Sequence, residues 1–327
     1  MNLGGVIHIN KKGICGLGLL LIILLLYYNK DTALDTIKPK TINLYKLLNV
    51  AIKAAENGGK EVVRVKDNIE IKTKGLTKEG QVDSVTTADF LSHCSMTKTL
   101  KHFFPTLKVI SEEAKATCDI NQSIDYSLQD VDKSLLDEYV QEEDITVWID
   151  PLDATQEYTE KLFNYVTTMV CVAVKEKPVL GIIHKPFNTT TSWAWVHKMT
   201  SKDLTQSEGH KNTKHDGPLK VVVSRSHSGQ IQEVLKKNFN KDFQLISAAG
   251  AGYKTLQVAT GIVDAYLHIT VIKKWDICAG NAILDALGGK MSTKFNKDID
   301  YSSNSEVINS DGLIATMEDH KMFLGIL

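Results

Sequence analysis

An uncharged apolar run near the N-terminus constrains the chain most, because it separates a candidate membrane segment from the rest of the sequence. Residues 13–28 carry no charge and follow Lys11 and Lys12. As a helix this run covers roughly 24 Å, less than the ~30 Å hydrocarbon core of a typical bilayer, and lysine snorkelling narrows the gap. Because no small-residue cleavage site follows, we predict an uncleaved signal anchor, with a cytosolic N-terminus and a lumenal remainder.

Composition predicts that the remainder is globular. The chain has 327 residues, of which 43% are hydrophobic and 24% charged, and a net charge of -1. These values exclude a disordered chain and give no overall attraction to nucleic acid. A hydrophilic stretch at 200–218 predicts an exposed connection and a boundary between two domains. We expect a cytosolic tip and anchor at 1–30, a lumenal stem at 31–40, an N-terminal α+β domain at 41–217 and a C-terminal α/β domain at 218–327.

Apolar periodicity predicts an α/β fold. Helical spacing covers residues 44–55, with a stop at Asn57, Gly58 and Gly59, and a second helix covers 90–104. The expected strands of the first half are 108–110, 146–149, 165–174, 179–184 and 193–196. In the second half we expect strands at 221–223, 245–246, 264–269 and 313–315, separated by helices at 230–238, 253–260 and 277–287.

The cysteines predict no metal site. Those outside the anchor are Cys94, Cys118, Cys171 and Cys278, without zinc-ligand spacing or a disulfide framework. We interpret Cys171, which lies in an apolar run, as a packed free thiol. The pairing of Cys94 with Cys118 stays open. Lumenal placement makes Asn121 and Asn188 candidate glycosylation sites.

Acidic residues follow predicted strands or begin a predicted helix. Glu112 follows strand 108–110, Asp150 and Asp153 follow strand 146–149, and Asp276 opens helix 277–287. Each residue alone is explained as a solvated turn or a helix cap. Together they can converge at the carboxyl edge of a sheet, where open α/β folds place their ligands.

Such a cluster needs a positive partner. Two carboxylates ~5 Å apart at an effective dielectric of ~20 repel by roughly 3 kcal/mol. Lys273 and Lys274, beside Asp276, are the only basic residues inside these motifs. Oxygen ligands favour Mg²⁺, Mn²⁺ or Ca²⁺ over zinc, and a two-metal centre supports hydrolysis of a phosphate ester. The acids therefore predict a metal-dependent phosphomonoesterase.

Four segments resemble the inositol monophosphatase family of lithium-sensitive Mg²⁺ phosphatases. They are WIDPLDATQEYTE at 148–160, KWDICAG at 274–280, EE at 112–113 and TTAD at 86–89. The resemblance implies a layered α-β-α-β-α sandwich of the inositol monophosphatase type, preceded by one N-terminal transmembrane helix, and two or three Mg²⁺ ions.

The same resemblance implies a role for each matching residue. The first Mg²⁺ would be held by Glu112, Asp150 and the carbonyl of Leu152, and the second by Asp150, Asp153 and Asp276. Asp89 and Thr155 would orient the attacking water and take its proton. The substrate would contact Ser224, His227, Gly250 and Lys254.

Ala154, which stands where most family members carry glycine, narrows the resemblance to a branch of nucleotide phosphatases. Resemblance to this branch implies that the protein removes the 3′-phosphate of adenosine 3′,5′-bisphosphate to give AMP, and thereby supports glycan sulfation. It also implies a single-pass type II Golgi membrane protein and leaves a homodimer open. The alternatives are a phosphatase acting on inositol phosphates or 3′-phosphoadenylyl sulfate, and a catalytically inactive, metal-binding lumenal protein. We expect no nucleic-acid partner.

Overall fold

The computed structural model describes residues 16, 18–24, 40–76, 82–114, 117–118, 123–206, 217–225, 228–239 and 241–326. The chain forms two units, Met1–Lys40 and Thr41–Leu327. In the first, residues 16 and 18–24 are helical. Within the described ranges, we find no helix with the length and hydropathy needed to cross a membrane. The other residues of the predicted anchor and most of the stem lie outside the described residues.

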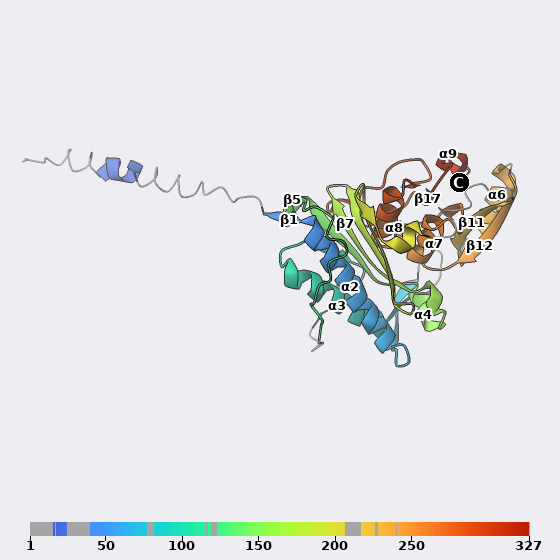
Figure 1. The fold of residues 1–327 in the computed structure, drawn as a ribbon, viewed down its shortest axis with the longest axis horizontal. Coiled ribbons are helices and arrows are strands. Elements are labelled where there is room, and N and C mark those ends of the chain that lie inside the picture. The colour runs from blue at the N-terminus through green and yellow to red at the C-terminus, as the bar shows by residue number, and fades with distance from the viewer. Residues whose placement is uncertain are drawn as a thin grey trace, which may run out of the picture. The chain divides into compact units, whose positions relative to one another are not determined.

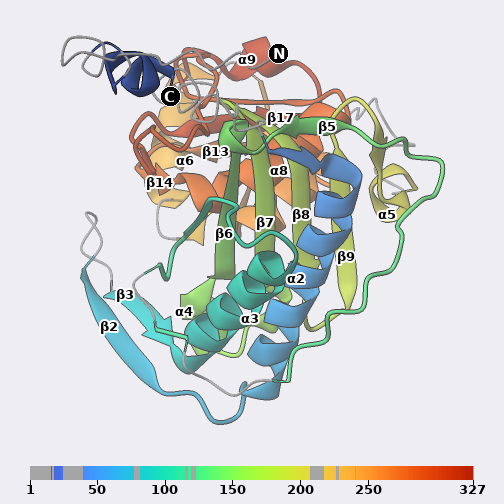
Figure 2. The ribbon, with the colours of Figure 1, turned by 90° about the vertical axis from the view of Figure 1, so that its left-hand side faces the viewer.

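The second unit is built of five alternating layers (Figure 1, Figure 2). Helices α2 (Leu44–Arg64) and α3 (Thr87–Phe103) cover the outer face of a six-stranded sheet. Helices α7 (Ala251–Ala259) and α8 (Lys274–Ala286) lie between this sheet and a five-stranded sheet. Helices α6 (Ser228–Asn238) and α9 (His320–Phe323) cover the far face of the second sheet. The predicted α-β-α-β-α sandwich is confirmed.

The first sheet places the predicted acidic motifs at one end. Its strand order is β10-β9-β8-β7-β6-β4. The strands are β4 (Val109–Ser111), β6 (Ile145–Asp153), β7 (Thr167–Val174), β8 (Lys177–Lys185), β9 (Thr190–Trp195) and β10 (Met199–Thr200). Strands β4 and β6 are parallel, with Ser111 paired to Ile149, so Glu112 and Asp150 follow at the same end. The other pairs are antiparallel.

The second sheet has the strand order β12-β11-β13-β17-β15. Its strands are β11 (Leu219–Ser224), β12 (Phe243–Ala248), β13 (Ala265–His268), β15 (Lys290–Ser292) and β17 (Leu313–Thr316). Strand β11 is parallel to β12 and β13, whereas β17 runs antiparallel to β13 and β15. The two sheets fall on either side of residue 217, and the division into two domains stays a prediction.

Short elements complete the second unit. They are the paired strands β1 (Thr41–Asn43) and β5 (Tyr139–Gln141), β2 (Ile71–Leu76) and β3 (Val82–Thr86), and β14 (Ile272–Lys273) and β16 (Ile308–Asn309), together with helices α4 (Thr155–Thr159) and α5 (Lys202–Thr205). Helices α2 and α3 pack against each other on the same face of the six-stranded sheet (Figure 2).

Helix α2 does not stop at its glycine pair, so that prediction was wrong. Asn43 caps its N-terminus by accepting a hydrogen bond from the amide of Lys46 at 3.0 Å, and the helix continues to Arg64. A Cβ atom on Gly58 would lie 2.6 Å from the Met96 side chain, and one on Gly59 would lie 2.5 Å from the His184 ring. The glycines therefore permit close packing inside the helix, which outweighs their low helix propensity.

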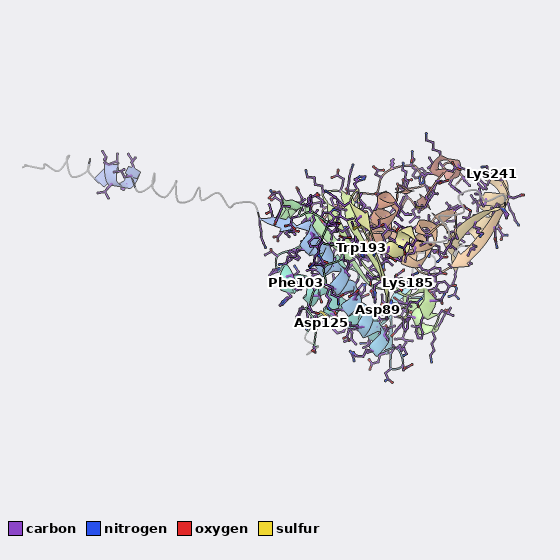
Figure 3. All side chains as sticks on the ribbon, in the orientation of Figure 1. Asp89, Phe103, Asp125, Lys185, Trp193 and Lys241 are labelled. Carbon is purple, nitrogen blue, oxygen red and sulfur yellow. A yellow bond between two sulfur atoms is a disulfide. The ribbon has the colours of Figure 1, made fainter. Side chains whose placement is uncertain are left out.

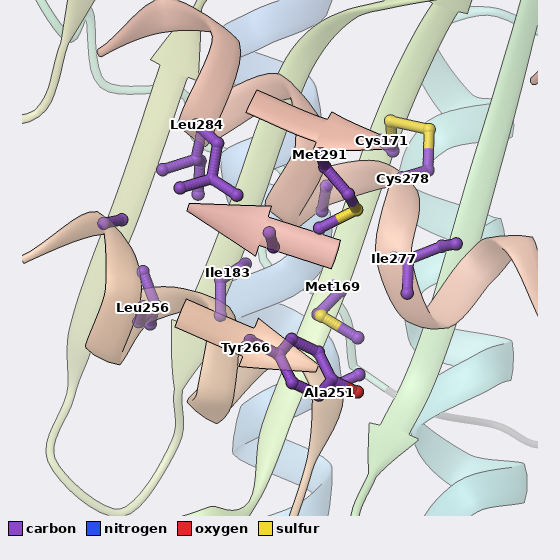
Figure 4. Close-up of a cluster of buried hydrophobic side chains, with 14 of the residues drawn as sticks. Met169, Cys171, Ile183, Ala251, Leu256, Tyr266, Ile277, Cys278, Leu284 and Met291 are labelled. Carbon is purple, nitrogen blue, oxygen red and sulfur yellow. A yellow bond between two sulfur atoms is a disulfide. The ribbon is translucent and has the colours of Figure 1, made fainter. Parts of the chain in front are cut away.

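Two disulfides cross-link the second unit. Cys171 on β7 is bonded to Cys278 on α8, so the interpretation of Cys171 as a free thiol was wrong (Figure 4). The two cysteines are separated by 107 residues, and so the local sequence carries no sign of the pairing. The open pairing of Cys94 with Cys118 is also resolved, because these residues form the second disulfide.

Candidate active site

Three carboxylates from distant parts of the sequence meet at one end of the first sheet. Glu112 follows β4, Asp150 lies in β6, and Asp276 lies in the first turn of α8. One carboxylate oxygen of each lies within 4.8 Å of the other two. Asp276 also caps α8, since it accepts a hydrogen bond from the amide of Lys273 at 3.1 Å. The capping interpretation and the clustering interpretation therefore both hold for this residue.

The cluster is acidic, with Asp150 buried and Glu112 and Asp276 partly buried. Burial raises the pKa of Asp150 and of Asp276 well above the usual range, and the charge of Glu112 raises both further. Lys273 lies 3.4 Å from a carboxylate oxygen of Glu112. Lys254 also interacts electrostatically with Asp276, and the pKa values of Asp150 and Asp276 are raised despite these lysines. Closely spaced oxygen donors of this kind fit a hard divalent cation such as Mg²⁺.

Asp153, the fourth predicted acid, forms hydrogen bonds with the N-terminus of helix α7. The Asp153 carboxylate accepts hydrogen bonds from the amides of Ala251 at 3.0 Å and Gly252 at 2.8 Å, and from the Thr167 hydroxyl at 3.0 Å. The two amides belong to the first turn of α7, where backbone N–H groups have no partner inside the helix, and Asp153 satisfies them. The cluster within 4.8 Å consists of Glu112, Asp150 and Asp276, and Asp153 lies beside it.

Buried Asp89 and partly buried Thr155 form a hydrogen-bonded pair next to the cluster. The Thr155 hydroxyl lies 2.9 Å from Asp89 Oδ1 and 3.0 Å from the carbonyl oxygen of Leu152. The amide and hydroxyl of Thr86 donate to Asp89 Oδ2 at 2.7 and 2.6 Å, which completes a capping box for α3. Burial raises the pKa of Asp89 to about 7. Figure 3 marks Asp89 within the second unit.

A polar cavity of about 370 Å³ adjoins these residues. It is lined by Gln156, Glu157, Ser224, Arg225, Ala248, Ala249, Gly250 and Lys254. Three of the four predicted substrate residues therefore line one cavity, whereas His227 lies outside the described residues. A Cβ atom on Gly250 would lie 2.9 Å from Asp153 Oδ2, so the cavity borders the acids.

Two basic side chains line the cavity, Arg225 in ion pairs and Lys254 buried. Arg225, which the sequence did not single out, contacts Glu157 at 2.8 Å and Glu160 at 2.9 Å. Its position between the predicted substrate residues Ser224 and His227 was the signal that could have found it. Lys254 is buried, with its ammonium 5.0 Å from the centre of the Tyr266 ring, and burial lowers the pKa of Lys254 to about 8.

A family model described as the inositol monophosphatase family matches residues 43–322. The chain belongs to the inositol monophosphatase family. It is 44% identical over 295 residues to the putative inositol monophosphatase 3 of Drosophila melanogaster, covering 88% of this chain and 81% of the relative. It is 43% identical over 290 residues to the Golgi-resident adenosine 3′,5′-bisphosphate 3′-phosphatase of Rattus norvegicus, covering 85% and 79%.

Solved structures support the same fold. The Thermotoga maritima IMPase has a TM-score of 0.63 and 17% identity, with 86% of this chain and 96% of that chain covered. An IMPase/NADP phosphatase complexed with Mg²⁺ and phosphate has a TM-score of 0.61 and 17% identity, with 82% and 90% covered. Enzymes of the family use Mg²⁺. The family and the named relatives make this chain a phosphatase, that is, a phosphoric monoester hydrolase.

Proposed function

We propose that this phosphatase removes the 3′-phosphate of adenosine 3′,5′-bisphosphate to give AMP, and thereby supports glycan sulfation. The observation that carries the proposal is the cluster of Glu112, Asp150 and Asp276 beside a cavity containing Arg225 and Lys254. The carboxylates suit a metal-assisted reaction at one phosphate, and the two cations suit a second anionic group on the same substrate. The name of the rat relative supports this substrate.

The oxygen donors suit two Mg²⁺ ions. We assign Glu112, Asp150 and the Leu152 carbonyl to the first, and Asp150, Asp153 and Asp276 to the second. When bound, the ions supply Lewis acidity toward the attacking water and the departing 3′-oxygen. A third ion remains part of the proposal.

Thr155 and Asp89 orient the attacking water in this proposal. Because the Thr155 hydroxyl can donate to Asp89 at 2.9 Å, its oxygen keeps a lone pair to accept a hydrogen bond from water. The proton of the water passes through this pair to Asp89, whose raised pKa suits a general base near neutral pH. The water oxygen bonds to phosphorus as the bond to the 3′-oxygen breaks, and the 3′-oxygen takes up a proton. No residue becomes phosphorylated.

The rest of the nucleotide would occupy the polar cavity. Ser224 ends β11 and Gly250 precedes α7, so a hydroxyl and backbone groups lie beside Arg225 and Lys254. We assign the second phosphate to these cations, and keep His227 as a predicted contact. Glu157 and Glu160 hold the Arg225 guanidinium and thereby fix its place at the cavity wall.

We also propose a lumenal location, with residues 13–28 as a type II signal anchor in the Golgi membrane. The name of the rat relative supports a Golgi location. Two disulfides support an oxidising compartment, because such bonds are rare in the cytosol. Treatment with an N-glycosidase tests the lumenal placement of Asn188, whose modification a cytosolic chain would lack. Glycosylation at Asn121 and a homodimer stay predictions.

Phosphate release from three substrates tests the assignment. We expect adenosine 3′,5′-bisphosphate to be hydrolysed with a kcat/KM at least tenfold above that for inositol 1-phosphate or 3′-phosphoadenylyl sulfate. The second candidate, an inositol phosphate phosphatase, is favoured by the relative named inositol monophosphatase 3 in Xenopus tropicalis, and faster release from inositol 1-phosphate would establish it. Mg²⁺ binding without release from any substrate would favour the inactive metal-binding alternative.

A further inference from the structure

Helix α3 contacts three segments that build the candidate metal site. Asp89 accepts a hydrogen bond from Thr155, as described above. One turn further, the Ser92 hydroxyl donates to the carbonyl oxygen of Pro151 at 2.7 Å, next to Asp150. His93 Nδ1 lies 2.8 Å from the Ser111 hydroxyl oxygen, next to Glu112. Residues within little more than one turn of α3 therefore hold the chain on the immediate flank of two of the clustered acids.

The next residue of α3 forms a covalent bond to the segment that follows Glu112. Cys94 is fully buried in α3 and bonded to Cys118, six residues beyond Glu112. Glu112 is therefore held to the same helix on both sides, through His93 and Ser111 before it and through the disulfide after it. This arrangement limits how far the Glu112 carboxylate can move away from Asp150 and Asp276.

Glu112 depends on such a restraint more than the other two acids do. Strand β4 has only three residues and lies at the end of the six-stranded sheet, so it pairs with one neighbour, β6. Beyond β4, the Glu112 amide donates to the Ile149 carbonyl over a long 3.4 Å. Asp150 lies inside β6, and Asp276 belongs to α8, a helix of 13 residues.

We propose that the Cys94–Cys118 disulfide positions Glu112 for metal binding, so that reduction of this bond weakens the affinity of the site for a divalent cation. Before a cation binds, the reduced chain must bring Glu112 into place, whereas in the oxidised chain the covalent bond to α3 already restrains it. Changes to groups that orient metal ligands typically cost 10–100-fold in affinity. The inference rests on the metal centre of the proposed function.

The Cys94–Cys118 and Cys171–Cys278 disulfides differ in accessibility. Cys118 is partly exposed, whereas Cys171 and Cys278 are both buried. A small dithiol such as dithiothreitol can therefore attack Cys118 Sγ as a thiolate, which releases Cys94 as the leaving thiolate. The second thiol of the reagent then displaces Cys118. The protein disulfide gains two electrons and two protons, and the reagent closes to its cyclic disulfide.

Mn²⁺ binding to the full chain tests the proposal, with electron paramagnetic resonance reporting the free ion. The chain is treated with dithiothreitol, desalted without oxygen and titrated, and peptide mass mapping after alkylation identifies the opened disulfide. We expect Cys94 and Cys118 to be alkylated, Cys171 and Cys278 to stay bonded, and the Kd for Mn²⁺ to rise about tenfold. Unchanged near-ultraviolet circular dichroism shows that the fold persists.

Two variants complete the experiment. The double variant Cys94→Ala/Cys118→Ala is expected to show the weakened Kd with or without dithiothreitol. The matched control Cys15→Ala leaves both disulfides intact and should respond as the parent chain does. An unchanged Kd after alkylation of Cys94 and Cys118, or a disulfide that dithiothreitol fails to open in the folded chain, overturns the proposal. If the oxidised chain binds no Mn²⁺, the metal centre itself is wrong.

Discussion

Replacing Asp150 with asparagine is expected to stabilise the metal-free protein while abolishing its stabilisation by Mg²⁺. Asp150 is buried and faces Glu112 and Asp276 within 4.8 Å. Asparagine has the same shape and keeps an oxygen that can accept the hydrogen bond from the Leu152 amide at 3.1 Å. The substitution therefore removes one negative charge from the cluster and leaves the local packing in place.

The size of the effect follows from the spacing and from proton linkage. At 4.8 Å and an effective dielectric of ~20, each pair of carboxylates repels by about 3.5 kcal/mol. Protonation limits the total destabilisation by the Asp150 charge, because protonating a carboxylate costs about 1.4 kcal/mol for each pH unit above its ordinary pKa of 3.8. This limit is about 5 kcal/mol at pH 7.5 and about 1.6 kcal/mol at pH 5. We expect Asp150→Asn to gain about 3–5 kcal/mol at pH 7.5.

Urea unfolding of the full chain, followed by tryptophan fluorescence, measures this gain. Because the pKa of Asp150 is raised on folding, its destabilising effect grows as the pH rises, so the advantage of the variant should shrink from pH 7.5 to pH 5. Adding Mg²⁺ should stabilise the parent chain and leave the variant unchanged. Asp132→Asn, outside the site, serves as a control and should show no gain. Equal stability of parent and variant in EDTA at pH 7.5 would refute the reasoning.

Three further outcomes are expected. Asp89→Asn and Thr155→Ala should each lower kcat by about 10²–10⁴-fold with Mn²⁺ binding retained, whereas Thr155→Ser should keep most activity; loss of Mn²⁺ binding would instead indicate a ligand role. Gly181→Ala should lower the free energy of unfolding in urea by about 1–3 kcal/mol, because the added Cβ would lie 2.2 Å from a backbone oxygen of α8. Gly217→Ala, whose Cβ would meet open space, should leave this free energy unchanged. Burial lowers the pKa of His184 to about 4, so about 3 kcal/mol of stability that is present above pH 6.5 should be lost as the pH falls to 4. The variant His184→Gln should flatten this pH dependence of stability, and an equally steep dependence in the variant would contradict the assignment.

The layers and the acidic cluster could be predicted because both follow from local patterns. Apolar periodicity marks each principal strand and helix of the sandwich. Glu112 and Asp150 follow two strands that run parallel, and Asp276 begins a helix packed on the same sheet, so sheet geometry brings them to one edge. The sequence does not show that β17 runs antiparallel between β13 and β15, since strand direction depends on how the connections pass around the sheet.

Other features depend on contacts between residues far apart in the chain. The glycine pair in α2 acts as a breaker in the sequence alone, and only the proximity of Met96 and His184 explains why it is helical. The role of Asp153 at the N-terminus of α7 depends on donors about a hundred residues away. The Arg225 ion pairs are similarly remote from Glu157 and Glu160 in sequence. No local pattern encodes these partners.

The bond between Cys171 and Cys278 has a consequence for the order in which the newly made chain matures. Translation must add another 107 residues after Cys171 before its partner exists. At about 5–20 residues per second, Cys171 waits for several seconds on the ribosome, whereas the partner of Cys94 emerges within the next few seconds. During that interval the thiols of Cys94 and Cys118 are both available, so an early, correct bond between them would also protect Cys171 from pairing with the wrong sulfur.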